Sequence, residues 1–174
     1  MKEIEENEIN TLLQIIAPAP LLRIGHFSDQ GTTLPRCLDA FCATHTYDYL
    51  LNCTSQTYHD HITQQSKVQP YADTTAVKYF SLERPSYMQH GKFYEYLFVT
   101  ADIEPSAREA FVQKAHKVIK NAGLILIFIP KNAQEETAQW TMLLEEHYFV
   151  ATNSIDLGQG WRVIISKKMH GWGG

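Results

Sequence analysis

The segment that decides the fold is YFVATNSIDLGQGWRVIISKK, residues 148–168. It contains two runs rich in β-branched and aromatic residues, 148–156 and 161–168, on either side of the glycine-containing turn 157–160. Strands joined by so short a connection pair in antiparallel fashion. The C-terminal part of the chain is therefore predicted to form a β-hairpin.

Upstream of the hairpin, segments with strand character and segments with helix character alternate. The expected strands are 21–25, 47–54, 76–83, 93–102 and 124–131, and the expected helices are 34–45, 55–68, 106–122 and a segment from Asn132 that carries Trp140. Parallel strands need such crossovers, and helices then cover both faces of the sheet. We therefore expect a three-layer α/β/α, Rossmann-like sandwich whose seven-stranded sheet is mostly parallel, with an antiparallel C-terminal strand.

Individual residues predict where several helices begin and end. Ser106 and Glu109 match a capping box, and Gly123 matches a C-terminal stop. A further amphipathic helix is expected over 2–17, before the helix-breaking APAP. Its apolar stripe is Ile9, Leu12, Leu13 and Ile16.

These elements suit one domain over residues 1–174. Residues 1–19 hold the N-terminal helix, 20–168 the α/β core and 169–174 a tail, in which Trp172 could dock on a partner.

Composition excludes several classes of function. The net charge is −4 and the 15 Lys and Arg residues are scattered, which disfavours nucleic-acid binding. No apolar run approaches the ~20 residues that a membrane span needs. The acidic start MKEIEENEIN does not resemble a signal peptide, so we expect a cytoplasmic protein.

Neither the cysteines nor the histidines indicate a metal site. The three cysteines form no C-x-x-C pair. In YHDH, residues 58–61, His59 and His61 would point about 200° apart on a helix. A solvated helix face explains this motif.

The segment YEYLFVTADIEP, residues 94–105, carries a resemblance to a known family. Together with the following helix and AGLILIFIP, it resembles the fourth strand, helix and fifth strand of class I S-adenosylmethionine-dependent methyltransferases, in their O-methyltransferase-like branch. The final hairpin is also similar to the end of that family's sheet, and the likeness spans about 20–168 by element order. The resemblance implies S-adenosylmethionine as cofactor at the carboxyl edge of the sheet.

The family's glycine loop maps onto GHFSDQG, residues 25–31. We expect the first strand to end at Gly25 and the loop to contact the cofactor through Gly25, Phe27, Ser28 and Gly31. His26, Phe27 and Ser28 stand where the family usually has small residues.

Further cofactor contacts are implied at the ends of the next strands. Asn52 and Cys53 replace the family's acidic ribose ligand, and Glu83 resembles its acidic residue near the adenine. Thr100 is a further expected cofactor contact; it stands where metal-dependent O-methyltransferases have an aspartate, so we predict no metal. Asp102 follows at the carboxyl edge, and Asp102 or His26 could act as general base.

Two functions remain open from these residues. One is an S-adenosylmethionine-dependent methyltransferase that binds a small-molecule cofactor and an unknown acceptor. The other is a catalytically inactive methyltransferase-like domain that binds or scaffolds a partner, and a homo-oligomer fits either function. A nicotinamide or flavin Rossmann domain fits less well, because the G-x-G-x-x-G fingerprint is missing.

Overall fold

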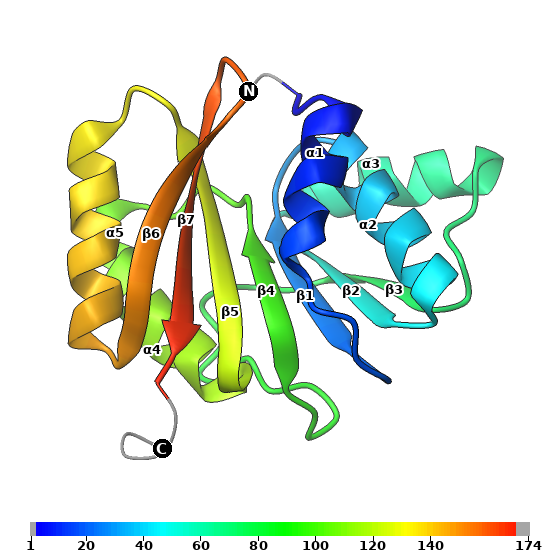
Figure 1. The fold of residues 1–174 in the computed structure, drawn as a ribbon. Helices are drawn as coiled ribbons and strands as arrows, with labels where there is room; N and C mark the ends of the chain where they lie inside the picture. The colour runs from blue at the N-terminus through cyan, green and yellow to red at the C-terminus, as the bar shows by residue number, and fades with distance from the viewer. Residues whose placement is uncertain (1–2, 170–174) are drawn as a thin grey trace.

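The computed structural model describes residues 3–169 (Figure 1). This part of the chain forms a seven-stranded sheet in the order β3-β2-β1-β4-β5-β7-β6. The strands are β1 (Arg23–Ser28), β2 (Asp48–Cys53), β3 (Thr75–Tyr79), β4 (Tyr94–Val99), β5 (Ile119–Pro130), β6 (Phe149–Leu157) and β7 (Trp161–Lys168).

The strand directions confirm the predicted fold class. Neighbouring strands among β1 to β5 are parallel, whereas β7 runs antiparallel between β5 and β6. The three-residue connection from β6 to β7 leaves no room for a crossover, so the predicted hairpin is also confirmed.

Helices cover both faces of this sheet (Figure 1). The helical elements are α1 (Glu6–Leu12), η1 (Leu13–Ile15), α2 (Thr33–His45), α3 (Gln56–Val68), η2 (Pro105–Ala107), α4 (Arg108–Val118) and α5 (Gln134–Glu146). Buried residues of α1, α2 and α3 pack on one face, and those of α4 and α5 pack on the other. Successive residues of a strand point to opposite faces, so Leu97 and Phe98 of β4 lie in different cores.

The predicted end of the first strand is wrong. β1 continues to Ser28, so Gly25, His26 and Phe27 lie within the strand and not in a loop. Gly25 is needed there because a Cβ at this position would lie 2.8 Å from the ring of Tyr94 in the neighbouring strand. The loop after β1 therefore begins at Asp29.

The predicted ends of the helix after β4 are also wrong. Pro105 opens a short 3-10 turn that contains Ser106, and α4 begins at Arg108 with no side-chain cap. The helix ends at Val118, and Gly123 lies inside β5. The extended strand β5 replaces the predicted last turn of this helix, because Ile119 already pairs with Tyr94 of β4.

The N-terminal helix is shorter than the predicted 2–17. α1 covers Glu6–Leu12 and continues as the 3-10 turn η1. The predicted apolar stripe is nevertheless confirmed, since all four of its residues are buried: Ile9, Leu12, Leu13 and Ile16. These side chains hold the N-terminal segment against α2 and the sheet.

Candidate functional site

The candidate site lies where the carboxyl ends of β1 and β4 meet. The carbonyl of Phe27 accepts hydrogen bonds from the amides of Thr100 and Ala101, at 2.9 and 3.0 Å. The chain leaves β1 toward β2 on one side, and β4 pairs with β1 on the other. Ligands of open α/β sheets bind at such a switch point.

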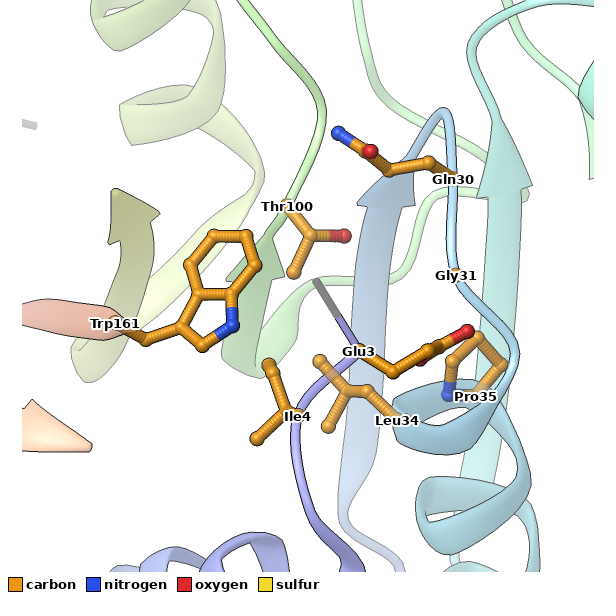
Figure 2. Close-up of a pocket in the computed structure, with 8 residues that line it drawn as sticks. All are labelled: Glu3, Ile4, Gln30, Gly31, Leu34, Pro35, Thr100 and Trp161. Atoms are coloured by element: carbon orange, nitrogen blue, oxygen red, sulfur yellow. The ribbon is translucent and has the colours of Figure 1, made fainter. Parts of the chain in front are cut away.

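A small pocket opens at this edge (Figure 2). Its walls come from the N-terminal segment, the loop after β1, the first turn of α2, the end of β4 and the start of β7. The lining residues are Glu3, Ile4, Gln30, Gly31, Leu34, Pro35, Thr100 and Trp161. The space between them is about 30 Å³, room for about two water molecules.

Glu3 places a carboxylate on the turn between β1 and α2. Its Oε1 accepts hydrogen bonds from the amide and the hydroxyl of Thr32, at 2.8 and 3.3 Å, and Oε2 accepts from the amide of Thr33 at 3.3 Å. Thr32 is the N-cap of α2 and makes no side-chain cap of its own. The first amides of a helix attract anions, so Glu3 supplies the missing cap.

The loop after β1 is fastened to neighbouring elements. The hydroxyl of Ser28 donates to the carbonyl of Gln30 at 2.8 Å, and the hydroxyl of Tyr58 donates to the carbonyl of Gly31 at 2.7 Å. Gly31 has a φ of +84°, a conformation that glycine adopts without strain. This turn therefore presents backbone amides in a fixed arrangement.

His26 lies behind the pocket and is not exposed at all. Its Nδ1 is 2.9 Å from the hydroxyl of Tyr49, and its Nε2 is 2.8 Å from the hydroxyl of Thr100. Both contacts are satisfied when Tyr49 donates to Nδ1 and the Nε2–H group donates to Thr100. Burial lowers the pKa of His26 to about 3, so the ring is neutral near pH 7 and orients Thr100.

The loop 84–92 covers Asn52, near the end of β2. Asn52 is fully buried, and its Oδ1 accepts a 2.9 Å hydrogen bond from Nε2 of Gln89. The Nδ2 of Asn52 is buried without a partner among the described residues. Cys53 is also fully buried, while Glu83 is exposed on the turn after β3 and does not line the pocket.

Asp102 is exposed just beyond β4, at the carboxyl edge where it was predicted. Its amide donates to Oδ2 of Asp29 at 2.9 Å, which ties the loop after β1 to the loop after β4. Burial raises the pKa of Asp29, and the hydrogen bond from Asp102 opposes that rise.

The structure thus separates the predicted cofactor residues into two groups. Gly31 and Thr100 line the pocket. The others lie within strands or on the distant turn: Gly25, Phe27, Ser28, Asn52, Cys53 and Glu83. Phe27 packs against Phe80, Tyr87 and Phe111, with ring centroids 5.3–5.9 Å apart, on the sheet face that α4 covers.

Sequence reasoning missed Glu3, Asp29, Gln89 and Trp161. Asp29 could have been found by extending the first strand to Ser28, since it then becomes the first loop residue. Glu3 contacts residues about 30 positions away, and no local pattern signals such a contact.

A wider groove of about 830 Å³ lies at the opposite, amino end of β4 and β5. Phe93, Lys117, Lys120 and Tyr148 line it, among other residues. We place the candidate site at the smaller pocket because the strand topology, and not cavity size, sets where ligands meet such a sheet.

Residues 3–169 contain neither a metal-binding cluster nor a membrane-spanning helix. No group of three or more His, Cys, Asp or Glu residues there is arranged to hold a metal ion. Within the same residues, every helix is too short or too polar to span a bilayer.

Comparison with known proteins identifies the fold. No protein-family model matches the chain, and no curated protein matches it in sequence. Its structure resembles an S-adenosylmethionine-dependent O-methyltransferase from Thermotoga maritima, with a TM-score of 0.77 and 10% identity over 99% of this chain and 69% of that chain. A TehB-like S-adenosylmethionine-dependent methyltransferase from Corynebacterium glutamicum gives a TM-score of 0.66 and 11% identity over 92% and 87% of the two chains.

The CurJ carbon methyltransferase is a third neighbour, with a TM-score of 0.65 and 11% identity over 92% of this chain. The match covers only 52% of the CurJ chain, so this chain spans about half of that neighbour. At such identities the likeness concerns the fold alone. The chain has the fold of the class I S-adenosylmethionine-dependent methyltransferases.

Proposed function

We propose that this chain binds S-adenosylmethionine at the carboxyl edge of its sheet and transfers the methyl group to an acceptor. The observation that carries the proposal is the carboxylate site on the turn between β1 and α2. The amides of Thr32 and Thr33 already hold the carboxylate of Glu3 there. The amino-acid end of the cofactor offers the same chemical group.

Other residues at this edge fit the rest of the cofactor. Asn52 carries a buried Nδ2 without a partner among the described residues, which could donate to a ribose hydroxyl. Gly31 allows close approach to the turn, since it has no side chain. When bound, the cofactor would supply an electrophilic methyl group on a sulfonium.

The residues of the chain itself would then orient the reactants. Thr100 is held by the neutral ring of His26 and faces the pocket, whereas His26 is too deeply buried to touch an acceptor. Asp102 is exposed at the rim, and we propose it as the base for an acceptor that must lose a proton. Methyl transfer depends mainly on positioning, so no larger catalytic set is required.

A second function is favoured by the tight packing of the site. Glu3 and Ile4 line a pocket of only about 30 Å³, and Gln89 covers Asn52. Small-molecule sites usually measure roughly 300–1,000 Å³. A methyltransferase-like domain that no longer binds the cofactor and acts as a binding module would retain such packing permanently.

Calorimetric titration of the full chain with S-adenosylhomocysteine and S-adenosylmethionine separates the two functions. The methyltransferase proposal predicts saturable binding with one site per chain. Absence of binding at millimolar ligand would instead support the binding module.

Two glycine variants test whether the ligand binds at the proposed site. Gly31→Val places a side chain at the carboxylate turn, and we expect at least a tenfold loss of affinity. Gly91→Val is the matched control, because Gly91 also has a positive φ, of +65°, but has open space around it. Equal affinities of the two variants would contradict the proposed location.

A further inference from the structure

The N-terminal segment reaches the candidate site from a firmly packed helix. Ile9 and Leu12 of α1 are buried in the core shared with α2, and the amide of Ala17 donates to the hydroxyl of Tyr96 at 3.0 Å. Residues 3–5 precede α1 without helical structure. A short extended piece thus joins an anchored helix to the pocket.

Glu3 uses the hydrogen-bond donors that a ligand carboxylate would need. The amides of Thr32 and Thr33 each donate to one of its oxygens. A second carboxylate cannot accept from the same two amides at the same time. Glu3 and the amino-acid end of the proposed cofactor therefore exclude each other.

Ile4 excludes the ligand by volume. Its side chain is only 6% exposed and lines the pocket together with Leu34 and Trp161 (Figure 2). With Ile4 in place, the remaining space holds about two water molecules. S-adenosylmethionine is much larger than this space, so it can enter only after residues 3–5 leave the pocket.

We propose that residues 3–5 are an intramolecular competitor of the cofactor, with Glu3 as a carboxylate mimic; this inference rests on the proposed function. The contacts of Glu3 are exposed to solvent, so they can be exchanged for those of a ligand, whereas Ile4 must leave the edge of the core before the cofactor enters. A tethered group acts at an effective concentration on the order of millimolar. The segment therefore lowers the apparent affinity for the cofactor and makes the site responsive to anything that draws the N-terminus away.

The experiment compares wild type, Glu3→Ala and Glu5→Ala of the full chain by calorimetric titration with S-adenosylhomocysteine. Glu5 is the matched control, because it is an exposed glutamate of the same segment and caps nothing with its side chain. We expect Glu3→Ala to bind at least tenfold more tightly than wild type, and Glu5→Ala to bind like wild type.

The other outcomes distinguish a failure of the proposed competition from a failure of the proposed function. Equal affinity of all three proteins would refute the proposed competition by residues 3–5 but not the proposed cofactor site. No binding by any of them at millimolar ligand would overturn the proposed function, and the competitor with it.

Amide hydrogen exchange without ligand tests the contact itself. Thr32 and Thr33 should exchange faster in Glu3→Ala than in Glu5→Ala, since only the first variant frees their amides. Unchanged protection would show that Glu3 does not hold this turn, and that would also overturn the inference.

Discussion

Gln89 and Asn52 are joined by a buried hydrogen bond of 2.9 Å, from Nε2 to Oδ1. Gln89 belongs to the loop 84–92, whereas Asn52 is near the end of β2. The bond holds the loop over the position at which the family resemblance implies a ribose contact. Loop 84–92 thus covers Asn52 on the sheet face that α4 packs against, outside the pocket that residues 3 and 4 line.

Removing this bond should make the site easier to open. We expect Gln89→Ala to bind S-adenosylhomocysteine a few-fold more tightly than wild type, because a ribose can then reach Asn52 without first breaking the bond that holds loop 84–92 over it. Lys92→Ala is the control, since Lys92 is an exposed residue of the same loop. Calorimetric affinities that are equal for the two variants would contradict this role of Gln89.

His26 should make stability depend on pH in the acid range. Burial lowers the pKa of His26 from the ordinary histidine value of 6.5 to about 3 in the folded chain, so between these pH values only the unfolded chain binds the extra proton. The contribution of His26 to the free energy of unfolding is complete above pH 6.5. It decreases by about 1.4 kcal/mol per pH unit as the pH falls toward 3. His26→Gln removes this dependence.

Urea unfolding between pH 7 and pH 4 measures the effect. The variant should be less stable at pH 7, because it disturbs the contacts with Tyr49 and Thr100, and the difference from wild type should narrow at lower pH. A constant difference across this range would show that His26 does not titrate as expected.

A side chain at position 25 should destabilise the folded protein while Tyr94 is present. A Cβ there would lie 2.8 Å from the Tyr94 ring, so we expect Gly25→Ala to lower the free energy of unfolding by about 1–3 kcal/mol. The same substitution should cost less in a Tyr94→Leu background, since the ring is gone. A double-mutant cycle with no coupling between the two positions would refute this explanation.

Arg108 should be the most important charged residue for the packing of α4 against α5. It is 7% exposed, and it donates to the carbonyl of Ile103, to Gln139 and to Glu136 at 2.8–3.0 Å. Arg108→Met leaves these acceptors unpaired and should cost about 2–4 kcal/mol in urea unfolding.

A surface ion pair provides the comparison for Arg108. Arg162 pairs with Asp156 on the hairpin, where both side chains are partly exposed. Arg162→Met should therefore cost at most about 1 kcal/mol. Similar losses for the two variants would mean that burial does not distinguish these arginines.

The sheet could be predicted because its signals are local. The runs around Leu97 and Leu126 are apolar on successive residues, as strands buried on both faces require. The glycines at 158 and 160 indicate the turn of the hairpin. Each of these patterns lies within a few consecutive residues, so it can be read without knowing the contacts.

The end of β1 could not be predicted in this way. His26 interrupts the apolar run, and only the distant hydroxyls of Tyr49 and Thr100 satisfy its ring within the sheet. Gly25 looks like a loop residue until the Tyr94 ring beside it is known. Polar and small residues in a buried strand depend on long-range partners, which the sequence does not display.

The sequence indicated where the candidate site would lie better than which residues would line it. Topology placed it at the carboxyl edge, and Thr100 and Gly31 do line the pocket. Glu3 lies far from this edge in sequence, and its side chain reaches it only through the packing of α1.

The location of the cofactor site is the claim on which the other proposals depend, and amide chemical shifts test it most directly. We predict that S-adenosylhomocysteine added to the ¹⁵N-labelled Glu3→Ala chain shifts Gly31, Thr32, Thr33 and Thr100 first. Shifts confined to the groove at the other end of the sheet, around Lys117 and Tyr148, would contradict the account.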